Sequence, residues 1–254
     1  MFCKDYLDLI SKLTGFLYDE VTKRGFSSVV LGLSGGIDSA VVALLCKRAF
    51  PNSTHTLLMP SFSSSKSSIE DALELCHQFK ISHTIIPLEN MQKSFINTLE
   101  IPKTSLMRIG NLSARLRMIC LYDYSFANSA LVIGTSNKSE LKLGYGTIYG
   151  DLASAINPIG NLYKSEIYSI ATHLEVPQSI MQKAPSADLY EGQSDEAELG
   201  YSYLELDTIM TFLEKGLEDE EILKKGCSKE ALEFVKMRMQ KMSFKQEMPL
   251  IARF

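Results

Sequence analysis

Hydrophobic and polar positions follow two periods along the first two thirds of the chain. Short apolar runs bounded by turn residues predict buried strands at 29–33, 54–59, 82–86 and 130–134. Between them, apolar residues at helical spacing predict helices over 4–24, from Ser39 onward, and over roughly 68–80, 89–99, 104–128 and 163–174. Gly110 and Asn111 predict an interruption of the helix over 104–128, and 67–70 has the spacing of a capping box.

Strands that alternate with helices predict an α/β fold, a doubly wound parallel sheet with helices on both faces. The C-terminal third is predicted to be helical. We therefore expect a single domain over 1–254, with a core at about 25–175 and a mostly helical part at about 176–254. Ligands of such sheets bind beyond the carboxyl ends of the strands. The loops after the first and fourth predicted strands are therefore expected to face one site.

Two segments lack a helical period. The first, 144–160, is rich in glycine, and the second, 191–198, is an acidic loop. Loops of this length are usually functional or mobile, so 144–157 and 187–200 are expected to be mobile without ligand. In the helical C-terminal third, an apolar stripe predicts core packing or a subunit contact. It consists of Leu232, Val235, Met239 and Met242.

Composition narrows the function classes. The 254 residues are 45% hydrophobic and 22% charged, as in an ordinary globular protein. A formal net charge of −4 gives no support for a nucleic-acid partner. No apolar run approaches the roughly 20 residues of a membrane span, and the first residues lack the apolar core of a signal peptide. The five cysteines form no CxxC pair, which indicates no zinc or iron–sulfur site and favours the cytoplasm.

The first predicted strand leads through a Ser-Gly-Gly turn into a helix. A glycine turn at a helix N-terminus presents backbone N–H groups, and the helix dipole adds positive potential, so the segment predicts an anion site. Gly35 and Gly36 permit close approach of a phosphate. Ser34 and Ser39 add hydroxyl donors, and Asp38 places a carboxylate where Mg²⁺ would sit beside phosphates.

The string Ser-Gly-Gly-Ile-Asp-Ser at 34–39 is neither a Walker A loop nor a dinucleotide-binding glycine motif. It resembles the SGGxDS loop of the ATP pyrophosphatase (PP-loop) superfamily, whose members split ATP between the α and β phosphates. This resemblance implies adenylation chemistry on an adenine nucleotide alpha hydrolase-like fold.

The loop after the fourth predicted strand offers a second set of polar groups. Taken alone, Asn137 and Glu140 indicate a helix start, with Asn137 as the cap. This loop is expected at the same edge of the sheet as Asp38, which favours a functional role as well. Thr135 could then contact a nucleotide, and Glu140 could be a second carboxylate ligand of the metal. Earlier in the chain, Arg115 and Arg117 are two positions apart on a predicted helix, so their side chains point to different faces of that helix. One could bind a ligand while the other is structural.

Several linked motifs narrow the family. GLSGGIDS, NLSARLRM, IGTSNKSE, GDLASAINPIGNLYKSEI and KAPSADL…QSDEAELG, in this order over about 32–200, resemble the ammonia-dependent NAD⁺ synthetases. The resemblance implies a carbon–nitrogen ligase that converts deamido-NAD⁺, ATP and NH₃ to NAD⁺, AMP and pyrophosphate through an acyl adenylate, the last step of NAD biosynthesis. It also implies ATP as co-substrate, Mg²⁺ and a homodimer.

The resemblance also assigns site residues. Asp38 and Glu140 would hold Mg²⁺ and, with Lys164, form the catalytic set. Arg115 and Lys245 would contact deamido-NAD⁺. The residues implied in ATP binding, with the glycine turn around the leaving pyrophosphate, are Gly32, Leu33, Ser34, Gly35, Gly36, Ile37, Asp38, Ser39, Thr135, Lys164 and Ser186.

Three positions depart from the family pattern. Phe244 stands before Lys245 where the family often has histidine. Ile148 and Ala155 stand where many members have a lysine and an aspartate that bind deamido-NAD⁺, and neither can make those polar contacts. The ATP half of the resemblance is therefore intact, and the half for the second substrate is altered.

Other functions stay open at this point. The superfamily also contains tRNA-modifying enzymes and GMP synthetases, and a nucleotide-binding module without catalysis is a further alternative. The scattered cysteines and acidic balance disfavour the first, and a GMP synthetase needs a different C-terminal segment. The presence of both Asp38 and Glu140 argues against a module without catalysis, because a passive binder needs no pair of metal-binding carboxylates. Because the glycine turn begins by residue 32, we expect no glutaminase domain in this chain and the use of free ammonia.

Overall fold

The computed structural model describes residues 5–186 and 193–252. Its centre is a parallel sheet of four strands in the order β3-β2-β1-β4. The strands are β1 (Val29–Gly32), β2 (Thr54–Leu58), β3 (Ser82–Ile85) and β4 (Leu131–Val132). Val29 of β1 pairs with Thr54 on one side and Leu131 on the other, so β1 is central and its carboxyl end opens at the middle of the sheet edge.

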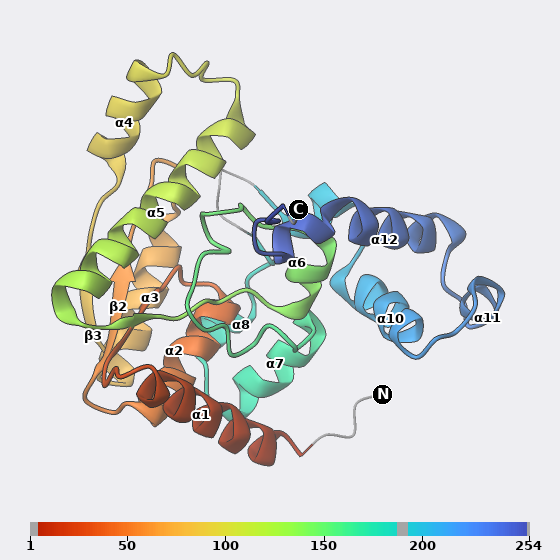
Figure 1. The fold of residues 1–254 in the computed structure, drawn as a ribbon, viewed down its shortest axis with the longest axis horizontal. Helices are drawn as coiled ribbons and strands as arrows, with labels where there is room; N and C mark the ends of the chain where they lie inside the picture. Colours follow the sequence, from red (N-terminus) through yellow and green to blue (C-terminus); the bar gives the residue numbers. More distant parts are fainter. Residues whose placement is uncertain (1–4, 187–192, 253–254) are drawn as a thin grey trace.

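Helices cover both faces of this sheet, as predicted (Figure 1). They are α1 (Tyr6–Lys23), α2 (Ile37–Ala49), α3 (Lys66–Gln78), α4 (Glu89–Thr98), α5 (Leu106–Asn128), α6 (Lys138–Leu143) and α7 (Lys164–His173). The alternation of side chains along β1 separates two cores. Val29 and Leu31 join the core with α1, α2, α3 and α7, whereas Val30 joins the core with α4 and α5.

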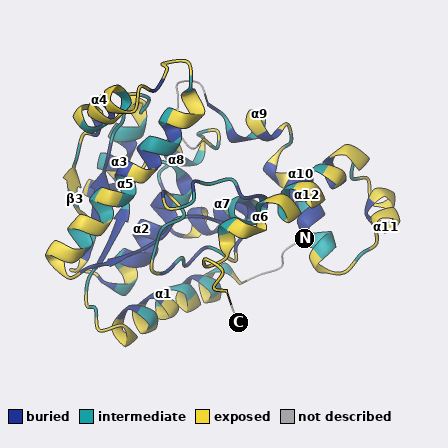
Figure 2. Ribbon diagram, turned by 45° about the horizontal axis from the view of Figure 1, so that its top comes forward, coloured by how far each residue is buried: buried dark blue, intermediate teal, exposed yellow. Residues whose placement is uncertain are grey.

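The helix α2 is enclosed on nearly every side. All residues from Ser39 to Cys46 are buried, since α1 and α7 pack against α2 on the sheet. Figure 2 shows α2 in the colour of buried residues and the outward side of α1 exposed. Because α2 is held this firmly, its N-terminus is a rigid support for the turn that precedes it.

The C-terminal third forms a separate helical cluster beside the sheet (Figure 1). Its elements are α9 (Asp195–Leu199), α10 (Tyr203–Glu214), α11 (Asp219–Lys224), α12 (Lys229–Met242) and the 3₁₀ helix η1 (Ser243–Gln246). The short helix α8 (Gln178–Met181) instead packs against α2 in the core beside the sheet. Leu232 and Val235 of the predicted stripe lie in the core of the C-terminal cluster, together with Leu143 at the end of α6. The cluster therefore packs directly on the helix that carries Glu140.

Three details differ from the sequence predictions. The helix α5 is continuous through Gly110, because one glycine in a helix costs only about 1 kcal/mol and the packed inner face outweighs it. The helix α3 begins at Lys66, since Ser65 is its cap and accepts a 3.0 Å hydrogen bond from the Ser68 N–H. The predicted capping box at 67–70 is therefore wrong.

The predicted acidic loop is helical in its second half. Asp195–Leu199 forms α9, with acidic residues in its first turn, where they favour a helix N-terminus. Residues 187–192 of this loop lie outside the described residues. The 144–160 segment is a loop, as predicted, and joins the sheet through one parallel bridge from Ile156 to Ile133. The mobility of both loops stays a prediction.

Gly35 in the turn after β1 tolerates no side chain. Its φ is +82°, and a Cβ there would lie 2.1 Å from the carbonyl oxygen of Ser68. Gly35→Ala is expected to lower the free energy of unfolding by about 3 kcal/mol, through left-handed strain and overlap. The matched control is Gly15→Ala in α1, where nothing lies within 4 Å and up to about 1 kcal/mol of stabilisation is expected. Urea unfolding measures both, and equal midpoints would contradict the prediction.

Candidate active site

The turn between β1 and α2 is held by its own side chains. The Ser39 hydroxyl donates to the Gly36 carbonyl at 3.0 Å and accepts from the Ser34 N–H at 3.2 Å. The Ser34 hydroxyl in turn accepts from the Gly36 N–H at 3.2 Å. These bonds fix the loop at the start of α2, where the first N–H groups of a helix have no partner within the helix, as an anion site requires.

A lysine joins the two predicted carboxylates. Lys164 Nζ makes an ion pair with Asp38 and lies 3.5 Å from Glu140 Oε1. The Asn137 side chain donates to Asp38 Oδ1 at 3.0 Å. The prediction that the loops after β1 and β4 face one site is therefore confirmed, and the first residue of α7 completes the cluster.

Burial makes this cluster electrostatically coupled. Burial would lower the pKa of Lys164, but the charges of Asp38 and Glu140 outweigh it and hold this pKa above its ordinary value. Burial raises the pKa of Glu140 and the charge of Asp38 raises it further, to about 8, against the opposing effect of Lys164. Removal of the lysine charge would leave two carboxylates close together in a buried place.

The helices that carry Glu140 and Lys164 are held by local and distant contacts. A capping box links Asn137 and Glu140 at the start of α6, as the sequence predicts for Asn137. The Ser139 hydroxyl donates to Asp207 Oδ1 at 2.5 Å and accepts from the Lys164 N–H at 2.9 Å. Asp207 of α10 thereby holds the first turns of α6 and α7 in one arrangement.

Asp207→Asn tests this positioning role. Asp207 is buried and also accepts from the Ser165 N–H at 2.9 Å. The amide of asparagine keeps one acceptor oxygen, but its NH₂ group would face either the Ser139 hydroxyl or the Ser165 N–H. One hydrogen bond is therefore lost, and we expect the free energy of unfolding to fall by about 2 kcal/mol. The control is Asp219→Asn, whose partner Lys236 is largely exposed and for which a change within about 0.5 kcal/mol is expected. Chemical denaturation that finds both variants alike would refute the assignment.

A cavity of about 660 Å³ opens at this edge of the sheet. Ten of the residues predicted for the site line it: Gly32, Leu33, Ser34, Gly36, Asp38, Ser39, Thr135, Glu140, Ser186 and, from η1, Lys245. Gly35 and Ile37 shape the turn behind them. Lys164 is 3% exposed and reaches the site through its two carboxylate partners.

The structure separates the two arginines of α5. Arg117 lines the cavity and donates to the Met59 carbonyl and the Ser61 hydroxyl, both at 3.2 Å. Arg115 is exposed and does not line the cavity. Neither Ile148 nor Ala155 contributes to its lining. The resemblance assigned Arg115 to deamido-NAD⁺, but within this chain Arg117, and not Arg115, lies beside the cavity.

The segment that carries Ser186 is tied to α3. Lys183 makes an ion pair with Asp71, and its Nζ lies 3.3 Å from the Ser68 hydroxyl. The carbonyl of Ser68 is the group that closes over Gly35. The 183–186 segment and the glycine turn are therefore packed against the same end of α3.

Sequence reasoning missed three residues of the site. Asn137 was assigned only a capping role, although its amide also holds Asp38. Asp207 and Lys183 gave no signal, because an acidic residue on a helix and a lysine before a proline segment are ordinary surface features. Their partners lie far away in the chain, so only the folded structure reveals them.

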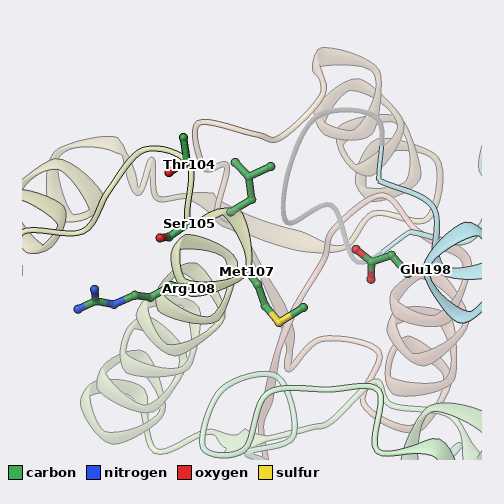
Figure 3. Close-up of a pocket in the computed structure, with 6 residues that line it drawn as sticks. Thr104, Ser105, Met107, Arg108 and Glu198 are labelled. Carbon is green, nitrogen blue, oxygen red and sulfur yellow. The ribbon is translucent and has the colours of Figure 1, made fainter.

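A smaller hollow of about 440 Å³ adjoins the cavity. It lies at the N-terminal end of α5, with Glu198 of α9 on the opposite side (Figure 3). Met107 and Glu198 line both spaces. In Figure 3 the side chain of Arg108 extends away from Glu198, whose carboxylate accepts hydrogen bonds from the Tyr145 hydroxyl at 2.5 Å and the Gln193 amide at 3.2 Å.

A parallel α/β sheet with a glycine turn at the start of α2 and a carboxylate pair beside it defines the class, an enzyme with the PP-loop fold. The sequence profile of NAD synthase matches residues 9–249, and the chain belongs to this family. An NH₃-dependent NAD⁺ synthetase of Wolinella succinogenes is 53% identical over 245 residues, which cover 96% of this chain and 95% of that protein.

Two solved structures support the assignment. An NH₃-dependent NAD synthetase from Campylobacter jejuni is 43% identical, with a TM-score of 0.84 over 98% of this chain and all of that one. An NMN synthetase from Francisella tularensis is 34% identical, with a TM-score of 0.89 over 99% of this chain and all of that one. The fold is therefore that of the NAD synthetases.

Proposed function

We propose that this enzyme converts deamido-NAD⁺ to NAD⁺ with ATP and free ammonia, releasing AMP and pyrophosphate, as the last step of NAD biosynthesis. The observation that carries the proposal is the cluster of Asp38, Glu140 and Lys164 beside the glycine turn, in a chain of the NAD synthase family. Curated relatives named as NH₃-dependent enzymes support free ammonia as the nitrogen donor.

The donor set fits Mg²⁺. Asp38 and Glu140 offer carboxylate oxygens, the hard ligands that Mg²⁺ prefers. Among the described residues, no group of three or more His, Cys, Asp or Glu side chains gathers to hold a metal, so the other ligands of Mg²⁺ would come from phosphates and water. Mg²⁺ held by these two residues would supply charge stabilisation on the phosphates.

The chain's own residues would place ATP for in-line attack. The turn at 32–39 would hold the β and γ phosphates by backbone N–H groups, with Thr135 and Ser186 as further contacts to ATP. A nicotinate carboxylate oxygen attacks the α-phosphorus, the bond from that phosphorus to the pyrophosphate oxygen breaks, and pyrophosphate leaves. Lys164, held by its carboxylates, would stabilise the charge that develops on the phosphates.

The second step needs no covalent nucleophile from the protein. Ammonia attacks the carbonyl carbon of the acyl adenylate, AMP leaves with the former carboxylate oxygen, and one proton is released. Arg115 and Lys245 would contact deamido-NAD⁺. The protein contributes orientation of the adenylate and exclusion of water, so the intermediate is aminated rather than hydrolysed.

The Francisella NMN synthetase supports a second candidate, amidation of the shorter nicotinate mononucleotide. It superposes closely on this chain, and the apolar Ile148 and Ala155 bring no polar group to a longer substrate. Turnover with deamido-NAD⁺ and with nicotinate mononucleotide, each with ammonium or glutamine, decides between them. The proposal expects deamido-NAD⁺ and ammonium to give the highest kcat/KM. A higher value with the mononucleotide would reassign the substrate.

We propose a homodimer formed through the outer face of α5. Ile119, Tyr122 and Phe126 are 50%, 41% and 93% exposed, and with Arg115 they share one helix face by their spacing. In such a dimer Arg115 would reach deamido-NAD⁺ from the interface, which explains its place outside the cavity. Sedimentation at micromolar concentration measures the mass, and a monomer would contradict this arrangement.

The remaining alternatives are not favoured. Relatives at about half identity over nearly the whole chain are curated NAD⁺ synthetases, which disfavours a tRNA-modifying enzyme, a GMP synthetase and a passive module. In the described part of the chain, no helix is long and apolar enough to cross a membrane. We propose that the chain acts as one unit in the cytoplasm, in keeping with the four described cysteines, which are free.

A further inference from the structure

Two basic side chains lie on the cavity wall formed by the C-terminal elements. Arg238 of α12 and Lys245 of η1 both line the cavity, beside Gly144, Tyr145 and Gly146. The 144–157 segment that they face contains no lysine or arginine. Positive charge at this wall therefore comes from the C-terminal helices alone.

Both side chains also donate hydrogen bonds to backbone carbonyls at the end of α6 and just after it. Arg238 Nε donates to the Leu143 carbonyl at 3.0 Å. Lys245 Nζ donates to the carbonyls of Gly144 and Gly146 at 2.7 and 2.8 Å. These bonds satisfy carbonyl groups that a helix end leaves free, so a purely structural role would account for part of the arrangement.

The charge of Arg238 exceeds what that structural role requires. Gln246 donates to the Leu141 carbonyl at 2.8 Å in the same way, so a neutral side chain suffices for such a bond. Only the Nε of Arg238 is used by a described acceptor, and neither Arg238 nor Lys245 makes an ion pair within the described residues. Burial lowers the pKa of Lys245, and the neighbouring Arg238 lowers it further, against the opposing charge of Asp151.

Asp151, which lines the same cavity, acts on Lys245 through its charge but forms no ion pair with it. Two adjacent half-buried cations that form no ion pair within the described residues favour a further anion between them and the cavity. The phosphates of ATP belong at the glycine turn, beside Asp38 and Lys164. The second substrate brings phosphate of its own, separated from its reacting carboxylate by the pyridine ring and the ribose. Its phosphate must therefore lie away from the glycine turn, on another wall of the cavity.

We propose that Arg238, together with Lys245, binds a phosphate group of the nicotinate substrate and thereby determines affinity for it. This assignment rests on the proposed function and adds a substrate-binding residue to it. The two NH₂ groups of a guanidinium match the spacing of phosphate oxygens. The hydrogen bond from Arg238 Nε to the Leu143 carbonyl holds the guanidinium in place.

Arg238→Gln separates charge from structure. The Gln Nε2 occupies the chain position of Arg Nε, so it keeps the donor to Leu143 and removes the charge. We expect KM for deamido-NAD⁺ to rise at least about tenfold, the loss of one charge-assisted bond, with KM for ATP and kcat within about twofold. The control is Lys241→Gln on the same helix, exposed and outside the cavity lining, where wild-type constants are expected.

The outcomes separate this proposal from the proposed function. An unchanged KM for deamido-NAD⁺, or a parallel loss of kcat and of ATP affinity, would show a structural role and overturn the assignment. If the wild-type enzyme forms no NAD⁺, the proposed function fails, and calorimetric titration of both proteins with deamido-NAD⁺ still decides the role of Arg238. Equal affinities, including no binding by either protein, overturn it.

Discussion

Asp38→Asn is expected to lower the turnover number on the order of 10³-fold while the fold is kept. Asp38 lies at the N-terminus of α2, where it makes an ion pair with Lys164 and accepts from Asn137. An amide of the same shape keeps the contact volume but offers a metal and a lysine no negative charge. The loss should therefore appear in kcat with saturating ATP and Mg²⁺.

Circular dichroism and steady-state kinetics on the same preparation check this prediction. Asp219→Asn, an exchange of the same type at a half-exposed carboxylate, should retain wild-type turnover. If Asp38→Asn also turned over at the wild-type rate, Asp38 would have no part in the reaction. An unfolded variant would instead assign Asp38 a structural role.

Lys164→Met is expected to affect both stability and turnover. The side chain of Lys164 is 4% exposed, and its charge separates Asp38 from Glu140. Without it, two carboxylates stay close together in a buried place, and breaking such a group costs about 3 kcal/mol or more of unfolding free energy. Turnover should fall on the order of 10²-fold, because the transferring phosphates lose a fixed cation.

Urea unfolding and initial rates measure the two effects separately. Lys236→Met is the matched control, because Lys236 pairs with Asp219 at the surface and such pairs contribute at most about 1 kcal/mol. A Lys164→Met protein as stable as the wild type would contradict the electrostatic account of the cluster. Normal turnover by that protein would remove Lys164 from the proposed chemistry.

The sheet and the glycine turn are predictable from the sequence because both depend on local patterns. The apolar run before Gly32 is short, contains β-branched residues and is bounded by glycine, which favours a buried strand, and the Ser-Gly-Gly turn into an apolar helix needs no distant partner. The meeting of Asp38 with Glu140 follows from topology, since parallel strands place their carboxyl ends at one edge. The helix start at Asn137 follows from a capping residue, and the helix over 163–174 follows from the spacing of its apolar residues.

The parts that escaped prediction depend on distant partners. Asp207 reaches Ser139 and Ser165 from α10, and nothing around Asp207 in the sequence indicates this. The continuity of α5 through Gly110 is decided by packing on the sheet, which outweighs a local helix breaker. The place of Arg117 rather than Arg115 at the cavity depends on the rotation of α5 against β2.

The transfer of oxygen tests the central claim most directly. The enzyme is given ATP, Mg²⁺, ammonium and deamido-NAD⁺ whose nicotinate carboxylate carries ¹⁸O in both oxygens, and the products are examined by mass spectrometry. Acyl adenylation predicts one ¹⁸O in AMP, one in the amide of NAD⁺, and none in pyrophosphate. Unlabelled AMP beside labelled NAD⁺, or label in phosphate with ADP as the nucleotide product, would contradict activation at the α-phosphate and with it the proposed role of the Asp38, Glu140 and Lys164 cluster.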